Sequence, residues 1–561
     1  MPLEPVVGAA APAESASPAP SAPPAAVPAK EIQEVDMAAH LSDLANLSAL
    51  STLRHLVVTA PRTAINLAGG LPPPAAFPMT GVTLSLADGS ETTVSEPFVA
   101  QQYHTHAIGL PTLTDKLRAL TARLQRPLGG MSRYGSAMVS GATHGMDLIT
   151  EMLLNPGESL IVEEYHFPVI REVLATGRGY HVFAAPVDEH GLVPEKLDAV
   201  LDQLARTCAP NRVGGGGASG AAGAAGAAGA TGAAPTESAA SAAVSAAARA
   251  SAPPSSAPIP FPRLLYTVPH GQNPTGSVIS MERKRAVYRV AQKHNLIILE
   301  DDPYFLLRWS IEEQGPDQQT EETDPMDADG AAADGASPAA PSLPPAAPLS
   351  APSSAPCSLR LVTPGSHGLE PGYLSIDTDL RVVRLDTVSK FMAPGLRIAW
   401  VTAHPLLADK VSSASAGATG GTGTLSSAIV DAILGKWGDE GLEAHVKRIQ
   451  TVYGTKALRA LESARRHLDG LAVVPAAPTA GMFLWIKCTC IDDSMKARDA
   501  MNREDVILVP AKLLHVDAND QTFVSPYVRA SFSFCTPEAF DEGMRRFAVA
   551  LRETANKENA N

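Results

Sequence analysis

The stretch "RLDTVSKFMAPGLR", residues 384–397, carries the strongest signal for the fold and for a functional site. It continues an apolar strand that begins at Val382 and then enters a short loop broken by Pro394. That loop holds Lys390 and Arg397, although two neighbouring cations repel each other. An anion held between them, with a lysine that is not permanently charged, would remove the conflict.

The composition narrows the possible classes of protein. A chain of 561 residues has room for two or three domains, but 48 prolines and 44 glycines indicate that a good part cannot pack into a core. The formal net charge of -14 argues against nucleic acid or an anionic membrane as a partner. Five cysteines without a CxxC pair predict no disulfide framework and suit a reducing compartment.

Two observations bear on localisation. No uninterrupted apolar run is long enough to span a bilayer. The first thirty residues lack arginine and contain Glu4 and Glu14, which is unlike a mitochondrial presequence. We therefore expect a cytoplasmic protein in preference to a mitochondrial one.

Three low-complexity segments without a hydrophobic period predict disorder, because they cannot offset their ordering entropy by burial. They are an N-terminal tail (1–40) and two surface insertions (209–259 and 311–358). The remaining chain is expected to form an N-terminal arm with a large domain (41–424), a small domain (425–555) and a short tail (556–561).

Apolar runs alternate with helical patterns in the predicted large domain. The runs "SLIVEE", "RLLYTVP", "LIILED" and "VVRLDT" predict a mostly parallel sheet covered by helices on both faces, the α/β class. After about residue 425, long helical patterns and the strand "GMFLWIK" predict a smaller α+β domain. Ligands of parallel sheets bind at the carboxyl ends of the strands, and the unusual side chains of this chain follow strand ends.

Four loops at those strand ends suggest one ligand. Ala142 and Thr143 open a helix whose free N–H groups, together with Thr387, Ser389 and Arg397, could hold a phosphate. Lys390 could form an imine with an aldehyde. Asp302, after an apolar run, could keep a pyridine nitrogen protonated, and Asn273 could donate to a ring oxygen. These features describe a site for pyridoxal phosphate.

From about Ile65 to Arg552, apart from the insertions, the chain resembles the fold-type I, class I/II aminotransferases. The resemblance rests on "INLAGGLPPPAAFP", "QQYHTHAIGLPTL", "YTVPHGQNPTG", "ILEDDPYFLL", "RVVRLDTVSKFMAPGLRIAW", "AAPTAGMFLWIK" and "SPYVRASFSFCTPEAFDEGMRRF". It is greatest to kynurenine/2-aminoadipate aminotransferases and fungal aromatic amino acid aminotransferases. It implies an aspartate aminotransferase-like fold, pyridoxal 5'-phosphate, a homodimer, and transfer of an amino group from kynurenine, 2-aminoadipate or an aromatic amino acid to a 2-oxo acid such as 2-oxoglutarate.

The resemblance also implies roles for individual residues. Lys390 looks like the lysine that forms the imine and carries the proton, and Asp302 like the pyridinium partner. The other cofactor contacts it implies are Ala142, Thr143, Phe167, Asn273, Phe305, Thr387, Ser389, Arg397 and, across a dimer interface, Tyr103. The substrate contacts it implies are Gly70, Tyr103, Asn273 and Arg529, the last for the α-carboxylate.

Departures from the family pattern, as we align it, fall at Phe305, Phe167, Ala142 and Thr143. Phe305 falls three residues after Asp302, where relatives have a tyrosine, and Phe167 replaces another tyrosine. Ala142 and Thr143 replace a Ser-Gln pair, which removes a side-chain phosphate contact but keeps the backbone donors.

Other functions stay open on these residues. A non-catalytic sensor or scaffold with the same fold is one alternative, and another reaction of the cofactor, such as β-elimination, is a second. His104 and His106 could suggest a metal pair, but the alignment places them in a loop facing substrate, so no metal site is expected.

Overall fold

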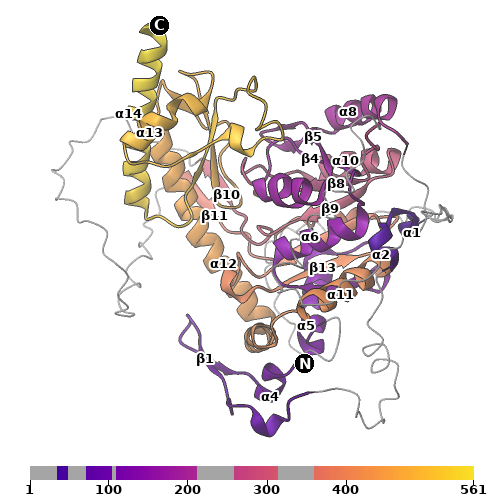
Figure 1. Ribbon diagram of the computed structural model, residues 1–561. Coiled ribbons are helices and arrows are strands. Elements are labelled where there is room, and N and C mark those ends of the chain that lie inside the picture. Colours follow the sequence, from indigo (N-terminus) through magenta and orange to yellow (C-terminus); the bar gives the residue numbers. More distant parts are fainter. Residues whose placement is uncertain (1–33, 48–70, 104–108, 211–257, 314–358, 561) are drawn as a thin grey trace, which may run out of the picture.

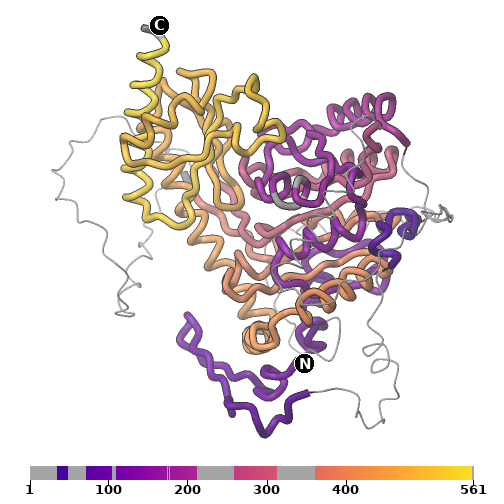
Figure 2. The backbone as a smooth tube through the Cα atoms, viewed as in Figure 1, coloured from indigo at the N-terminus to yellow at the C-terminus, as the bar shows by residue number. Residues whose placement is uncertain are grey.

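In the computed structural model the protein is described for residues 34–47, 71–103, 109–210, 258–313 and 359–560. These residues form a large lobe around a seven-stranded sheet and a second lobe around a four-stranded sheet (Figure 1). The tube view shows the C-terminal residues gathered in the second lobe (Figure 2).

The seven-stranded sheet has the order β3-β13-β12-β9-β8-β4-β5. The strands are β3 (Gly135–Val139), β13 (Ala399–Ala403), β12 (Val382–Thr387), β9 (Ile297–Asp301), β8 (Leu264–Thr267), β4 (Ser159–Glu163) and β5 (His181–Ala185). From β12 to β5 all neighbours run parallel, which confirms the predicted mostly parallel sheet. β13 is antiparallel to both neighbours, because the short loop after β12 can only return the chain in the opposite direction.

The sheet is buried on both faces, which explains the unbroken apolar runs of its strands. On one face, Leu299 and Leu385 pack in the core formed with helices α6 (Ala142–Leu153) and α11 (Pro405–Thr419). On the other face, Ile298 and Val382 pack in a second core with α8 (Pro194–Thr207) and α10 (Met281–Lys293). We call these the α6 face and the α10 face.

The second lobe contains an antiparallel sheet of order β14-β15-β17-β16. Its strands are β14 (Ala472–Val473), β15 (Phe483–Cys488), β17 (Tyr527–Ser531) and β16 (Val509–Pro510). Helix α12 (Thr424–His467), broken at Gly438, leads from the large lobe to this sheet, and α13 (Arg498–Arg503) and α14 (Pro537–Ala560) cover it (Figure 1). The predicted α+β character of this region is confirmed.

The remaining elements are short, apart from one helix. Helix α5 (Pro111–Gln125) packs against α12. A hairpin of β1 (Thr83–Ser85) and β2 (Glu91–Thr93), together with α4 (Pro97–Gln101), packs against the first part of α12, where Val94 and Ala100 share a small core with Ala428 (Figure 1). The others are α1 (Met37–His40), α2 (Asp43–Leu47), the π-helical turn Ile170–Ala175, α7 (Thr176–Arg178), β6 (Val187–Asp188), β7 (Gly191–Leu192), β10 (Ser310–Glu313) and β11 (Leu359–Val362).

The ends of the predicted disordered segments are ordered, which corrects their boundaries. Helix α1 lies inside the predicted tail, where the Val35 N–H donates to the Asp379 carbonyl over 2.7 Å. Residues 311–313, predicted as insertion, form part of β10 and pair with β11. Ala209 pairs with the backbone at Ile259, so this insertion leaves and re-enters the fold at one place. The rest of these segments lies outside the described residues.

None of the helices in the described ranges is both long enough and apolar enough to cross a bilayer.

Candidate active site

The loop that follows β12 is fixed by its own hydroxyl groups. Thr387 Oγ1 donates to the Ile398 carbonyl over 3.0 Å and accepts the Ser389 N–H over 3.1 Å. Ser389 Oγ lies 2.8 Å from Thr387 Oγ1. These bonds hold Lys390, the next residue, at the carboxyl end of the sheet.

Arg397 reaches the start of α6, as the sequence predicted. Its Nη2 donates to the Ser140 carbonyl over 3.3 Å, and Gly141, directly before the helix, has φ 88°. A Cβ at Gly141 would collide with the Arg397 guanidinium, so only glycine allows this approach. The guanidinium and the free N–H groups at Ala142 and Thr143 therefore surround one position that suits an anion.

The surroundings of Lys390 shift the pKa of its ammonium in opposite directions. Burial and the Arg397 charge lower the pKa of the Lys390 ammonium, and the Asp301 charge opposes them. The two cations of the loop are thus close enough to act on each other, as the sequence suggested. A lysine with a lowered pKa is more readily available as the neutral amine that attacks a carbonyl.

The structure corrects the choice between the two consecutive acids. Side chains alternate along a strand, so Asp301 lies on the α6 face with Leu299, and Asp302 lies on the α10 face. It is Asp301 whose charge acts on Lys390. Asp301, and not the Asp302 that the sequence suggested for the pyridine nitrogen, is therefore the acid whose charge reaches the lysine.

Asp302 belongs to a buried charge network on the α10 face. Its Oδ2 lies 3.0 Å from Arg384 Nη1 and 2.8 Å from His270 Nδ1. His270 Nε2 lies 2.8 Å from the Lys284 ammonium of α10, so Nδ1 carries the proton donated to Asp302. Arg384 also pairs with Glu300 and Asp386. The Oδ2 atom of Asp302 thus holds strands and helix together, while its Oδ1 atom is buried without a hydrogen-bond partner among the described residues.

Phe305 belongs to this same network, which corrects its predicted role as a cofactor contact. Its ring lies 5.2 Å from the Arg384 guanidinium carbon and 5.5 Å from the His270 ring centre. Counting from Asp301, the residue three positions later is Tyr304. The apparent departure at Phe305 therefore disappears, because Tyr304 supplies the hydroxyl that seemed to be missing.

Tyr304, Asn273 and Arg529 gather beside Asp301 from different elements. The Asp301 and Arg529 charges both act on the buried Tyr304 hydroxyl, whose pKa they shift in opposite directions. Arg529, on β17, donates to Asn273 Oδ1 over 2.8 Å. Its guanidinium carbon lies 4.6 Å from the ring centre of Phe483. The sequence did not indicate Phe483 or Tyr304, although "GMFLWIK" had already been recognised as a strand.

The structure says less about the other predicted site residues. Phe167 is half-buried in the segment after β4. Tyr103 is 68% exposed at the end of α4, and Gly70 lies outside the described residues. The prediction that Tyr103 acts in a partner subunit stays a prediction.

Two buried polar atoms show that the residues fit pyridoxal phosphate. Asp301 Oδ1 and Arg529 Nε are both buried and have no hydrogen-bond partner within the described part of the chain. A protonated pyridine nitrogen would satisfy the first, and a substrate carboxylate the second. With the anion position at Gly141 and the Lys390 amine, each functional group of the cofactor has a matching side chain.

Comparisons with known proteins agree with this arrangement. The family described as "Aminotransferase class I and II" matches residues 362–547. A mitochondrial kynurenine/alpha-aminoadipate aminotransferase of Mus musculus is 27% identical over 516 residues, which cover 90% of this chain and 96% of that protein. An aromatic amino acid aminotransferase of Schizosaccharomyces pombe is 27% identical over 527 residues, covering 87% and 91%.

Solved structures share the fold. Aminotransferase Aro8 of Candida albicans superposes with a TM-score of 0.67 at 20% identity, covering 93% of this chain and 99% of that one. A Pyrococcus horikoshii kynurenine aminotransferase superposes with a TM-score of 0.57 at 21% identity, covering 92% and 98%. Fold and site together define a pyridoxal-phosphate-dependent transferase of the aspartate aminotransferase type. The chain is similar to the class I and II aminotransferases over residues 362–547, and it is an enzyme that uses pyridoxal 5'-phosphate.

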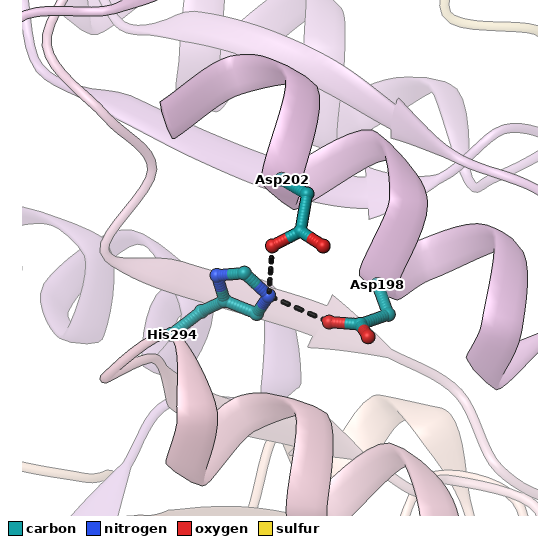
Figure 3. A group of neighbouring side chains, drawn as sticks. All are labelled: Asp198, Asp202 and His294. Carbon is teal, nitrogen blue, oxygen red and sulfur yellow. Dashed lines mark hydrogen bonds and ion pairs between the residues drawn. The ribbon is translucent and has the colours of Figure 1, made fainter. Parts of the chain in front are cut away.

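A cluster of metal-ligating residue types lies away from the active site (Figure 3). His294 Nε2 is 2.7 Å from Asp198 and 3.7 Å from Asp202, two carboxylates one turn apart on α8. The Lys293 ammonium is 2.8 Å from Asp198 and 3.1 Å from Asp202. Because an ammonium already balances these carboxylates, the cluster is explained as an ion-paired contact between α8 and α10.

Glu163, at the end of β4, is a buried acid close to the site. It accepts hydrogen bonds from Thr267 Oγ1 (2.7 Å) and Gln272 Nε2 (2.8 Å). Gln272 precedes Asn273, and its Oε1 accepts the Thr275 N–H over 2.8 Å, so Glu163 braces the Asn273 loop. Burial raises the pKa of Glu163 to about 7 despite these bonds.

This raised pKa predicts a pH-dependent stability. The folded protein binds the Glu163 proton more tightly than the unfolded chain, so this stability is complete below the ordinary pKa of 4.5 and is lost as the pH rises through about 7. The shift corresponds to about 3 kcal/mol. Glu163→Gln should therefore reduce the fall in thermal midpoint between about pH 5 and about pH 8. An amide in place of the carboxylate changes the bond with Gln272, and that cost is the same at every pH. An unchanged slope would contradict the prediction.

Proposed function

We propose that this enzyme moves the α-amino group of kynurenine, 2-aminoadipate or an aromatic amino acid to a 2-oxo acid such as 2-oxoglutarate. The observation that carries the proposal is the convergence of Lys390, Asp301 and Arg529 at the carboxyl end of one sheet. The substrate classes are those of the similar proteins, which include kynurenine/alpha-aminoadipate and aromatic amino acid aminotransferases.

In this proposal Asp301 replaces Asp302 as the partner of the pyridine nitrogen. Asn273 and Tyr304 flank the ring oxygen, and Phe167 covers the ring face. The phosphate lies against Arg397 and the N-terminus of α6, with Thr387 and Ser389 beside it. These placements follow from the unpartnered Asp301 oxygen and from the glycine-dependent approach of Arg397 to the helix.

The substrate is held at its carboxylate by Arg529. A guanidinium can bind a carboxylate through two parallel hydrogen bonds, and Nε is a buried donor without a partner among the described residues. Asn273, bonded to Nη1, fixes the orientation of the guanidinium, and the Phe483 ring supports it from one side. The Cα of a substrate bound in this way is directed toward Lys390.

Catalysis then depends on what the side chains do around the reacting carbon. When bound, pyridoxal phosphate supplies an aldehyde for the amino groups and a ring that withdraws electrons. The Lys390 amine would take the proton from the substrate Cα and hold it for return to the reacting atoms. Asp301 keeps the proton on the pyridine nitrogen during this transfer, and its buried position strengthens the interaction.

We also propose that the active unit is a homodimer. Tyr103 is exposed directly after α4, the helix that packs on the first part of α12. A tyrosine in this place can reach the active site of a second copy, which would make two identical sites per dimer.

The alternatives predict different products. A scaffold would show no turnover, but it would have no need for Lys390, Asp301, Arg397 and Arg529 around one position. A β-eliminating enzyme would release ammonia and a 2-oxo acid without consuming an amino acceptor.

A panel of amino donors, each with 2-oxoglutarate, tests the proposal. We expect glutamate to form with kynurenine, 2-aminoadipate or an aromatic donor, with kcat/KM at least roughly tenfold above that for an aspartate donor, since differences in pocket fit commonly have this size. Formation of ammonia without glutamate would favour elimination, and the absence of any donor-dependent change in the cofactor absorbance would refute transamination.

A further inference from the structure

Tyr266 lies under the active site and has no role in the chemistry described so far. It is a residue of β8 whose side chain is 1% exposed, and it shares the α6 face with Asp301 on the neighbouring strand β9. Its hydroxyl donates to Asp301 Oδ2 over 2.8 Å. This is the only hydrogen bond given to the Asp301 carboxylate by a side chain of the described residues.

We propose that Tyr266 is a positioning residue that orients the Asp301 carboxylate for the pyridine nitrogen of the cofactor. The inference rests on the proposed function, because it requires Asp301 to be the pyridinium partner. Tyr266 itself does not touch the substrate or the reacting atoms.

The division of the two carboxylate oxygens supports this role. Oδ2 is engaged by Tyr266, and Oδ1 is buried without a partner in the described part of the chain. The terminal torsion of an aspartate has broad minima, so a carboxylate without a second bond can turn its oxygens away from a ligand. The Tyr266 side chain is held in a central strand, and its hydrogen bond fixes Oδ2. The other oxygen, Oδ1, is therefore held in one orientation.

The same bond also influences whether Asp301 is ionised. Burial raises the pKa of Asp301 to about 7, and the Tyr266 hydroxyl lowers it by stabilising the carboxylate. The ionisable groups that act on Asp301 come from three neighbouring strands and the site loops: Tyr266, Glu163, Asp302, Tyr304, Arg384, Asp386 and Lys390. Removing the hydroxyl should therefore raise the pKa of Asp301 further and leave less of the carboxylate at neutral pH.

Tyr266→Phe tests the proposal, and Tyr373→Phe is the matched control. Tyr373 is equally buried, but its hydroxyl has no hydrogen-bond partner among the described residues and it packs in the core of the α10 face. Binding of pyridoxal 5'-phosphate to the apoenzyme is measured by absorbance from mildly acidic to mildly alkaline pH. For Tyr266→Phe we expect roughly tenfold weaker binding at neutral pH, the loss typical of a hydrogen bond to a charged group, and a binding midpoint shifted to higher pH. Tyr373→Phe should match the wild type in both.

A double-mutant cycle with Asp301→Asn separates the inference from the proposed function. If Tyr266 acts through Asp301, its replacement should weaken binding no further in the Asp301→Asn background. Equal, additive losses in both backgrounds, or a wild-type pH midpoint in Tyr266→Phe, would overturn the role of Tyr266. If Asp301→Asn alone binds the cofactor as the wild type does, the proposed function loses its pyridinium partner instead. Should the apo form of Tyr266→Phe not stay folded, the pH titration of the cofactor absorbance in the holoenzyme is compared with that of the wild type, and an unchanged titration would overturn the role of Tyr266.

Discussion

Replacing Lys390 with alanine is expected to lower the turnover of transamination by roughly four orders of magnitude, the upper range for loss of a proton-transferring group. The amine is held at the end of β12 by the Thr387 and Ser389 bonds, and burial with Arg397 lowers its pKa. No other lysine among the described residues is placed to act on the substrate Cα in its stead. The rate of glutamate formation in single-turnover and steady-state assays measures the loss.

The cofactor should still bind to Lys390→Ala, because Asp301, Arg397 and the N-terminus of α6 are unchanged. Its absorbance should shift to that of the free aldehyde and should no longer respond to the donor in the mixing time. Lys196→Ala, at an exposed position of α8, is the control and should keep full activity. Turnover within tenfold of the wild type in Lys390→Ala would exclude the lysine from the chemistry.

The sequence predicted the large sheet because its strands are apolar without interruption and are separated by helical patterns. The same runs predicted where the site would lie, since the carboxyl ends of neighbouring parallel strands meet at one edge. Arg397 and the start of α6 illustrate this: they are more than 250 residues apart in the chain, yet a hydrogen bond joins Arg397 to Ser140. Strand order alone was sufficient to bring these two loops together.

The face of the sheet to which each side chain of β9 points could not be predicted in the same way. A strand buried on both faces has no polar alternation, so "LIILEDD" does not reveal which acid faces which core. Long-range partners determine which face each acid points to. Asp301 bonds with Tyr266, whereas Asp302 pairs with Arg384 and His270. Those pairs depend on strand register, which a single sequence does not contain. Phe305 was taken in place of its neighbour Tyr304 for the same reason.

Phe483 was missed because its role depends on the second lobe. It lies at the start of β15, opposite Ser531 of β17, and one side of its ring supports Arg529. The sequence indicated a strand there but not that its first residue would lie under an arginine 46 positions later. Contacts between two separately folded sheets leave no periodic signal in either sheet.

The second large effect should distinguish the two acids by changing them separately. Asp301→Asn is expected to lower kcat by roughly 10²- to 10³-fold, the usual loss when a preorganised charge is removed from an active site. Its thermal midpoint should change little, because burial already raises the pKa of Asp301 to about 7 and a neutral amide suits that position. Asp302→Asn should instead lower the thermal midpoint and leave kcat largely unchanged.

Asp302 is paired with Arg384 and His270 at 0% exposure, so Asp302→Asn leaves a buried arginine short of one of its carboxylates. Breaking a buried ion pair on one side costs about 3 kcal/mol or more, and the thermal midpoint should fall by several degrees. At a temperature where both variants are folded, Asp302→Asn should retain kcat within about tenfold of the wild type, since its side chain points away from Lys390. Measuring kcat and the thermal midpoint of both variants at one pH checks the prediction. If Asp302→Asn loses activity and Asp301→Asn does not, the strand phase assigned to this site is reversed.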